Sequence, residues 1–418
     1  MEPTRLSAAD VDQQIEVVKH AELAVGVLTY NHGETLKRVV DAVGLGLEKY
    51  AARVPVALVD SDAGSADDPT RIFAQTGLPL VLARHEAPAR ERLTVPYHGV
   101  PGRTAGIRVL LDVARRLGAR AVLLVEGDVV SIEPEWIERL ARPVMEDGAD
   151  LVLPIYSRHR YDGTITNLLV APLVRALFGR RIRQPIGGQY AISGRLAQHF
   201  LGHAGWDHAA GRDVFDLWMS GVALSEGFSV WETWLGPHVI ESRTRTADLP
   251  TMLAETLGGV FGLMHRHPEL WMHASPAGGL PVTGPPVLPS TERRDIGLAR
   301  MISAFRLGVK DLLPIWQHIL ARDTLEDVLS LDASEDDRFR FPDSLWVRLV
   351  YDFAVGHHLG VLHRDHLLRS IVPLYLGRVA SFLLETLDLG ATATEARLDA
   401  LGAAFEREKP YLVSHWTE

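Results

Sequence analysis

Short, unbroken apolar runs alternate with helical spacing through the first third of the chain. Residues 23–29 (LAVGVLT) form such a run, and residues 34–49 then place Leu36, Val40 and Val43 on one helical face. Further strands are predicted at 54–59, 78–83 and 121–125, and further helices at 67–75 and 105–117. Apolar runs of this length fit strands that are buried on both faces. Because strands and helices alternate, the pattern predicts a parallel sheet covered by helices.

The alternation continues to about residue 267 and then gives way to helices alone. Residues 274–290 (ASPAGGLPVTGPPVLPS) are rich in proline and lack periodicity, so we expect a linker there. Helical spacing then predicts helices at 295–320, 324–331, 343–358, 365–387 and 394–407. The predicted fold is α/β, with a Rossmann-like, mostly parallel sheet domain over 1–273 and an all-helical domain over 291–418.

Composition narrows the classes of protein that fit this pattern. The net charge of −10, without a long basic run, argues against nucleic acid as a partner. The chain has no cysteine, which excludes disulfides and thiolate metal sites. The N-terminal stretch has no apolar signal core, and we find no membrane span. A cytoplasmic protein is expected, with the helical domain packed on the first domain or forming a homodimer.

Carboxylates follow two of the predicted strands. Asp60-Ser61-Asp62 ends one strand, and Glu126-Gly127-Asp128 ends the apolar run that begins at Ala121. Open α/β sheets bind ligands at the carboxyl ends of their strands. Oxygen ligands there suit Mg²⁺ or Mn²⁺ carrying a diphosphate. On these residues alone, an ordinary polar exit from a strand explains the pattern equally well.

Six segments, taken together, resemble one enzyme family. They are VDSDAGSADD, PGRTAGIR, VEGD, YDGTITNLL, QPIGGQYAIS and a Gly-x-x-x-x-Asp helix that contains Asp216. In this order they resemble the GT-A glycosyltransferases that make mannosylglycerate, glucosylglycerate and glucosyl-3-phosphoglycerate. The resemblance covers about residues 24–265 and, more faintly, the C-terminal helices. It implies a GT-A fold for the sheet domain.

The resemblance implies a donor site at the ends of the strands. Pro101-Gly102-Arg103 sits where the family has Gly-Lys-Gly; a cation there can hold the donor phosphate, and Arg103 can do so with a bidentate fork. Asp62 replaces the usual glycine. Glu126 replaces an aspartate, and its longer arm is expected to reach ribose. The full set of expected donor contacts is Thr29, Tyr30, Asn31, Asp60, Ser61, Asp62, Gly102, Arg103, Glu126 and Gly127.

The resemblance also implies a metal site. Asp128 matches the family's metal-binding aspartate. The family's second ligand is a histidine of a His-Arg pair, and Glu241, followed by Ser242-Arg243, stands at that position here. His238 is the nearest histidine. Both glutamate and histidine bind Mn²⁺, so either residue can complete the site with Asp128.

An acceptor site is implied farther along the chain. The expected contacts are Arg158, Thr166, Gln184, Gly187, Gly188 and Gln189. Glycine lets backbone N–H groups approach an anion or hydroxyl closely. Thr164 replaces an arginine found in the enzymes that use phosphoglycerate, which favours free glycerate. Residues 158–160 (Arg-His-Arg) fit either a carboxylate site or a solvated cluster.

The resulting prediction is a hexosyltransferase with Asp216 and Arg103 as its catalytic residues. It would use a UDP-, GDP- or ADP-sugar, Mg²⁺ or Mn²⁺, and a small hydroxy acid, with retention by front-side attack as the resemblance implies. Asp216 would orient hydroxyl groups. The alternatives are transfer to 3-phosphoglycerate or a larger glycoside, and a non-catalytic nucleotide-sugar-binding protein. The histidines at 357, 358, 363 and 366 fit a helix face better than zinc.

Overall fold

The computed structural model describes residues 8–89, 91, 99–206, 215–241, 248–292, 297–332 and 338–417. The chain forms two compact units, each built from separate stretches. The sheet unit comprises Met1–Ser157, Ile186–Ala247 and Leu280–Val287. The helical unit comprises Arg158–Pro185, Asp248–Gly279 and Leu288–Glu418.

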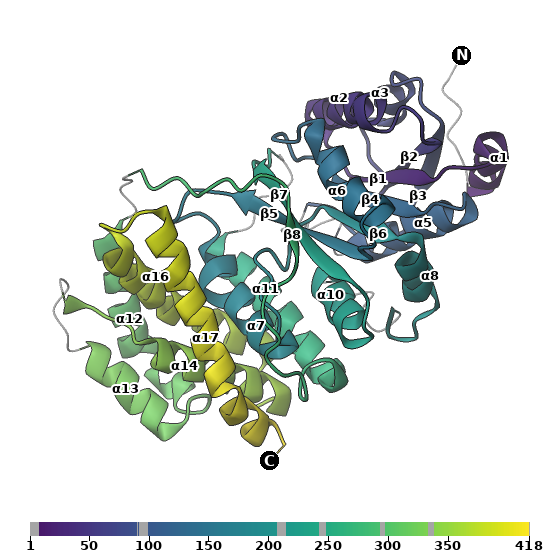
Figure 1. The fold of residues 1–418 in the computed structure, drawn as a ribbon. Helices are drawn as coiled ribbons and strands as arrows, with labels where there is room; N and C mark the ends of the chain where they lie inside the picture. Colours follow the sequence, from purple (N-terminus) through teal and green to yellow (C-terminus); the bar gives the residue numbers. More distant parts are fainter. Residues whose placement is uncertain are drawn as a thin grey trace. The chain divides into compact units, whose positions relative to one another are not determined.

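The sheet unit is built on an eight-stranded sheet in the order β3-β2-β1-β4-β6-β5-β7-β8 (Figure 1). Among the strands described, β6 alone runs antiparallel to its neighbours. The bounds are β1 Leu23–Thr29, β2 Val56–Asp62, β3 Leu80–Arg84, β4 Ala121–Glu126, β5 Leu151–Ser157, β6 Tyr190–Ser193, β7 Val230–Pro237 and β8 Val282–Thr283. The prediction of a Rossmann-like, mostly parallel sheet is confirmed.

Helices cover both faces of the sheet, which explains the unbroken apolar strands. Every residue of β1 and β4 is buried. Helices α2 (Gly33–Tyr50) and α6 (Glu135–Met145) pack on the face that contains Leu23, Val25 and Leu123. Helix α5 (Arg103–Arg116) lies on the opposite face (Figure 1). A Cβ on Gly26 would lie 2.7 Å from Leu110 Cδ1, so this glycine lets α5 approach the sheet.

The remaining helices of the sheet unit are shorter. They are α1 Ala8–Val18, α3 Thr70–Ala74, α8 Gly194–Gly202 and α10 Phe215–Ser225. Strand β2 extends three residues beyond its predicted end at 59, so Asp60 and Asp62 belong to the strand itself. Burial explains the difference, because Asp60, Ser61 and Asp62 are as enclosed as the apolar residues before them.

The helical unit contains the C-terminal helices and two earlier stretches of the chain. Its elements are the π-helix η1 Thr166–Val170, α7 Ala171–Phe178, α11 Leu249–Arg266, η2 Pro268–Leu270, α12 Leu298–Trp316, α13 Arg322–Asp332, α14 Asp343–Leu359, α15 Arg364–Ser370, α16 Val372–Thr386 and α17 Ala391–Trp416. Arg175 of α7 pairs with Asp399 and Glu406 of α17 at 2.8 Å each. These contacts help explain why the compact units do not follow the predicted division at 273 and 291.

The expected linker also contains part of the sheet. Residues Val282 and Thr283 form β8, which pairs with Glu232 and Thr233 of β7. Lys409 donates a hydrogen bond to the carbonyl of Ala274 at 2.7 Å. The proline-rich composition identified a stretch without helices, whose first residues belong to the helical unit and whose middle belongs to the sheet unit.

The prediction of a single helix over 365–387 is wrong, because the stretch is divided into α15 and α16. Pro373 lies in the first turn of α16, where proline is well tolerated, and Ile371 separates the two helices. By length and apolar composition, Arg364–Thr386 is long enough to cross a membrane, which the sequence analysis did not identify. However, 72% of the tested window is buried within the protein, as expected of a core helix.

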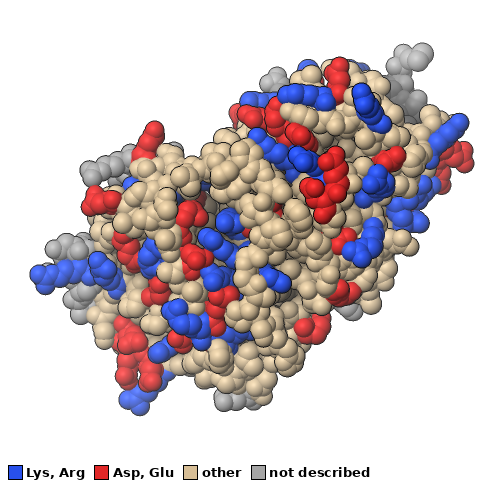
Figure 2. All heavy atoms as spheres, in the orientation of Figure 1, with Lys and Arg blue, Asp and Glu red and all other residues tan. Residues whose placement is uncertain are grey.

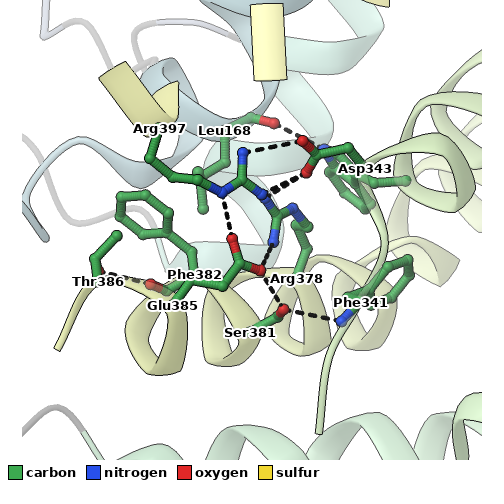
Figure 3. Close-up of polar contacts among 10 residues, drawn as sticks. Leu168, Phe341, Asp343, Arg378, Ser381, Phe382, Glu385, Thr386 and Arg397 are labelled. Atoms are coloured by element: carbon green, nitrogen blue, oxygen red, sulfur yellow. Dashed lines mark hydrogen bonds and ion pairs between the residues drawn. The ribbon is translucent and has the colours of Figure 1, made fainter. Parts of the chain in front are cut away.

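A buried network of charges joins α14, α16 and α17 (Figure 3). Arg378 is fully buried and donates to Asp343 at 3.0 Å and to Glu385 at 2.9 Å. Arg397 pairs with the same two carboxylates at 2.6 Å each. Ser381 also donates to Glu385, at 2.6 Å. Each carboxylate therefore faces two guanidinium groups, which offsets the cost of burying the charges.

We predict that Glu385→Gln destabilises the protein, because it leaves Arg378 buried with one carboxylate fewer. Breaking a buried ion pair from one side costs about 3 kcal/mol or more. The free energy of unfolding measured in urea tests this. Glu326→Gln is the matched control, because the Arg322–Glu326 pair is exposed and such pairs contribute about 0–1 kcal/mol. Equal effects of the two variants would contradict the prediction.

Candidate active site

The register of the parallel strands gathers the predicted donor residues at one edge of the sheet. Asp60 lies opposite Val27, and Asp62 lies opposite Thr29. Glu126 lies opposite Leu28 on the other side of β1. The carboxyl ends of β1, β2 and β4 therefore meet. This is the position at which open α/β sheets bind ligands.

Asp60 is the most enclosed carboxyl of β2, and its side chain accepts a hydrogen bond from Thr29 Oγ1 at 2.7 Å. Burial raises the pKa of Asp60 well above its usual range, and Asp62 adds to the rise, although the Thr29 hydrogen bond opposes it. A raised pKa favours the neutral form of the carboxyl group. A hydrogen-bond donor arriving from a ligand would favour the ionised form instead.

Several other predicted donor residues are held by local contacts. The backbone N–H of Asn31 donates to Ser65 Oγ at 2.9 Å, and Asn31 has a positive φ of 53°. Asp62 accepts the N–H of Ser65 at 2.8 Å, which is the turn contact expected of an aspartate at a strand end. Tyr30 is half-buried beside them. These contacts fix the shape of the loops that follow β1 and β2.

His85 contacts two residues of the candidate site, and the sequence analysis did not predict it. Its Nδ1 lies 2.9 Å from Ser61 Oγ, and its Nε2 lies 3.0 Å from the carbonyl of Pro101. His85 thus connects the end of β2 to the loop before α5. The sequence offered no signal for it, because a lone histidine after a strand has no characteristic spacing.

Arg103 begins α5 and is buried, with 7% of its surface exposed. It forms an ion pair with Asp216, and its Nε lies 3.9 Å from Glu126 Oε1. Burial alone would lower the pKa of Arg103, but Asp216 and Glu126 outweigh burial and raise it. Within the described residues, Nε and Nη2 have no hydrogen-bond partner. Arg103 is therefore a fixed cation with donor capacity left for a ligand.

Gly102 allows the chain to enter α5 at this point. Its φ is +64°, and a Cβ there would lie 2.5 Å from the carbonyl oxygen of Glu86. Its N–H donates to Glu91 Oε2 at 2.8 Å. Glycine meets both requirements, because it alone adopts this backbone conformation without a steric cost.

The Gly187-Gly188 loop is arranged differently from what we expected. Both N–H groups donate to the hydroxyl of Tyr190, at 2.7 and 3.1 Å. Already paired, they do not point to an anion, so the expected role of these two amides is not supported. Gly188 has a φ of +80°, and a Cβ there would lie 2.6 Å from Glu126 Cδ. The glycine therefore makes room for Glu126.

Glu126 also has partners other than the expected ribose. Its Oε2 accepts a hydrogen bond from Gln189 Nε2 at 3.4 Å, and its Oε1 faces Arg103. Gln189 in turn contacts the hydroxyl of Tyr156. The neutral amide of Gln189 suits this position, because a second carboxylate beside Glu126 would repel it.

A short antiparallel pairing brings the two candidate metal-binding segments together. Val129 pairs with Ile240, and the N–H of Glu241 donates to the carbonyl of Asp128 at 3.1 Å. Asp128 and Glu241 are therefore opposed residues, whose side chains project to the same face. His238 is three residues before Glu241, so the alternation of side chains along an extended strand directs it to the other face. There its ring stacks on Tyr156 at 4.1 Å between centroids.

The register therefore distinguishes between the two alternatives for the second metal ligand. Asp128 is 1% exposed, and Glu241 is exposed to solvent. Their oxygen atoms are the type that Mg²⁺ and Mn²⁺ prefer. Glu241, rather than His238, fits the position beside Asp128. Ser242 and Arg243, which also entered the sequence argument, lie outside the described residues.

Asp216 lies in the first turn of α10 and is 2% exposed. Besides its ion pair with Arg103, it lies beside the hydroxyl of Tyr190, whose pKa burial and Asp216 raise. The expected neighbours at 211–214 lie outside the described residues. Asp216 is thus held by two partners rather than serving only as a cap of its helix.

The predicted acceptor residues are divided between the units. Gly187, Gly188 and Gln189 belong to the sheet unit. Arg158, Thr166 and Gln184 belong to the helical unit.

Within the helical unit, Thr166 begins the π-helix η1, a rare structure that often marks functional sites. Gln184 is 6% exposed, and its Oε1 has no hydrogen-bond partner among the described residues. Thr164 is hydrogen-bonded to the hydroxyl of Tyr375 at 2.6 Å.

Two members of the Arg-His-Arg segment have structural roles. Arg160 is buried and donates to the carbonyls of Thr386 and Leu389, at 2.8 and 2.7 Å. His159 is buried and lies 2.7 Å from the carbonyl of Glu292. Neither a solvated cluster nor a carboxylate site describes these two residues. A Cβ on Gly163 would lie 2.9 Å from Arg158 Nη1, so Arg158 folds back over its own segment.

Histidines gather at two further places. His358 lies 2.7 Å from His265, between Nδ1 atoms, and stacks on Trp416, which agrees with a helix-contact role. His199, His203 and Glu226 could together face a metal ion. However, His203 Nδ1 accepts the N–H of Gly205 at 2.9 Å. The proton of neutral His203 is then on Nε2, where a metal would need the lone pair.

Charges on the visible surface are mixed. Figure 2 shows Lys and Arg interspersed with Asp and Glu on this face. Proteins that bind nucleic acid gather basic residues in a patch or stripe instead.

Comparisons with known proteins give matches to solved structures. No protein-family model matches the chain, and no curated protein matches it. Glucosyl-3-phosphoglycerate synthase from Mycobacterium tuberculosis, in complex with phosphoglyceric acid, is 20% identical over 64% of this chain and 85% of that chain, with a TM-score of 0.42. The same enzyme with Mn²⁺, UDP-glucose and phosphoglyceric acid is 19% identical over 63% and 85%, with a TM-score of 0.43.

Proposed function

We propose that this chain is a metal-dependent hexosyltransferase that moves a hexose from a nucleoside diphosphate sugar to a small hydroxy acid. The proposed acceptor is glycerate. The observation that carries the proposal is the sheet edge at which β1, β2 and β4 end. It gathers a buried cation, Arg103, with the carboxylates of Asp60, Glu126 and Asp128. Such an edge can accept both a nucleoside and its phosphates.

The donor set fits a divalent cation. Asp128 and Glu241 are opposed in register and offer carboxylate oxygens. Mg²⁺ is commonly bound through one or two carboxylates together with substrate phosphates and water. When bound, the ion neutralises charge that develops on the leaving diphosphate.

The chain's own residues would do the remaining work. Arg103 is held in place by Asp216 and Glu126, and its remaining N–H groups would bind a phosphate oxygen. Asp60, with Ser61 beside it, would accept hydrogen bonds from the nucleoside. Asp216 would orient a sugar or acceptor hydroxyl rather than act as a base. Its carboxylate is already engaged by Arg103 and Tyr190, which suits retention by front-side attack.

The preference for an unphosphorylated acceptor rests on the charges of the expected acceptor segment. Thr164, which replaces the arginine of the enzymes that use phosphoglycerate, holds no charge and bonds to Tyr375. Arg160 is occupied by backbone carbonyls. This favours an unphosphorylated acid over 3-phosphoglycerate.

The test is transfer by the purified protein. UDP-, GDP- and ADP-linked glucose and mannose are each supplied with Mn²⁺ and glycerate or 3-phosphoglycerate, and products are identified by mass spectrometry. We expect one donor to give a hexosylglycerate, with no product when EDTA is present. Binding of a nucleoside diphosphate without transfer to any acceptor would favour the non-catalytic alternative and contradict this proposal.

A further inference from the structure

Tyr190 joins two parts of the sheet edge that the sequence treats as separate motifs. It is fully buried at the start of β6, directly after the Gly187-Gly188 loop. Its hydroxyl accepts the N–H groups of both glycines, at 2.7 and 3.1 Å. The Asp216 carboxylate lies beside the same hydroxyl, whose pKa burial and this carboxylate raise.

These contacts use the whole hydrogen-bonding capacity of a phenol. A tyrosine hydroxyl has one proton to donate and two lone pairs that accept. Here the lone pairs receive the two glycine N–H groups, so the proton is left for Asp216. Burial and the neighbouring Asp216 raise the pKa of Tyr190 well above its usual range. The hydroxyl therefore keeps the proton that this arrangement needs.

The Gly187-Gly188 loop is also connected to Asp216 through a second series of contacts. The hydroxyl of Tyr156 donates to the carbonyl of Gly187 at 2.7 Å and contacts Gln189. Gln189 donates to Glu126, which faces Arg103, and Arg103 pairs with Asp216. The contacts thus close into a ring that starts and ends at the loop. A movement of the loop must disturb the Arg103–Asp216 pair from both sides.

We propose that Tyr190 is a positioning residue, whose hydroxyl fixes Asp216 and the Gly187-Gly188 loop in one arrangement for sugar transfer. This inference rests on the proposed function. Tyr190 itself touches no substrate in this account. It sets the direction of the Asp216 carboxylate, and through the loop it sets the position of Glu126 and Arg103.

Tyr190→Phe tests the inference, because it removes the hydroxyl and keeps the ring. Hydrogen–deuterium exchange should show faster exchange at the amides of Gly187 and Gly188. The kcat of transfer should fall about 10- to 100-fold, as expected when buried hydrogen-bonding groups lose their partner. The Kd of the nucleoside without its phosphates should stay within about twofold, because its proposed contacts, Asp60 and Ser61, lie on β2 and a positioning defect acts on turnover.

Tyr351→Phe is the matched control. Tyr351 is also fully buried, and its hydroxyl donates to the carbonyl of Phe405 at 2.6 Å within the helical unit. The control loses the same atom and should keep kcat. Melting temperatures of both variants show whether a loss of folding explains any change.

The outcomes separate this inference from the proposed function. An active wild type with an unchanged kcat in Tyr190→Phe overturns it, and so does unchanged exchange at the glycine amides. If the wild type transfers no sugar to any acceptor, the proposed function fails on that result. The amide exchange of Tyr190→Phe then decides alone whether the hydroxyl holds the loop.

Discussion

Asp128→Ala is expected to abolish the Mn²⁺-dependent binding of a nucleoside diphosphate. Asp128 is 1% exposed and lies opposite Glu241 in the short antiparallel pairing. Removing a ligand should weaken binding at least as much as removing a group that only supports one, which costs about 10- to 100-fold. Isothermal titration with UDP, GDP and ADP, each with Mn²⁺ and then with EDTA, measures the loss.

The neighbouring candidates make a pair of controls for this experiment. Glu241→Ala should also weaken metal-dependent binding, because its side chain shares a face with that of Asp128. His238→Ala should leave it nearly unchanged, since the His238 ring stacks on Tyr156 instead. Full nucleotide binding by the Asp128 variant, or binding that EDTA does not affect, would contradict the metal role.

The sheet was predictable because each buried strand is marked by its own apolar run in the sequence. β1 and β4 are buried at every residue, so their sequences are unbroken apolar runs with little room for another interpretation. The meeting of Asp60 and Glu126 also follows from sequence. Parallel strands of one sheet that end in carboxylates present them at the same edge, here with β1 between β2 and β4.

The division into compact units was not predictable in the same way. Residues 158–185 look like a continuation of the α/β pattern, yet α7 packs on α17 through Arg175 and its two carboxylates. Such contacts join residues more than 200 positions apart. No local composition or periodicity reports them, so the proline-rich stretch at 274–290 was the strongest boundary signal available.

The contacts within the candidate site were likewise not predictable from local sequence. Sequence identified Arg103 and Asp216 separately, but not that they form an ion pair across 113 positions. It left Glu241 and His238 as equal alternatives, and only the pairing of residues 128–130 with 239–241 distinguishes them. Tyr190 and His85 were missed because their roles depend on partners brought close by folding.

Arg103→Met is expected to reduce both stability and turnover. The variant leaves Asp216 and Glu126 buried without their cation, and breaking a buried pair from one side costs about 3–5 kcal/mol. Loss of a positioned donor at a developing charge lowers kcat by about 100- to 1000-fold. Unfolding in urea measures the first effect, and initial rates of sugar transfer measure the second. Asp216→Asn, which keeps the shape of the side chain, should be the milder of the two single changes.

The double variant Arg103→Met/Asp216→Asn separates the structural part of the pair from the catalytic part. Removing both charges together leaves no isolated Asp216, so its destabilisation should be smaller than the sum of the single effects by about 0.5–3 kcal/mol. Turnover should not recover with stability, because the phosphate would still lack its cation. A double variant that regained wild-type kcat would contradict a catalytic role for Arg103. The pair would then serve only to hold α5 against α10.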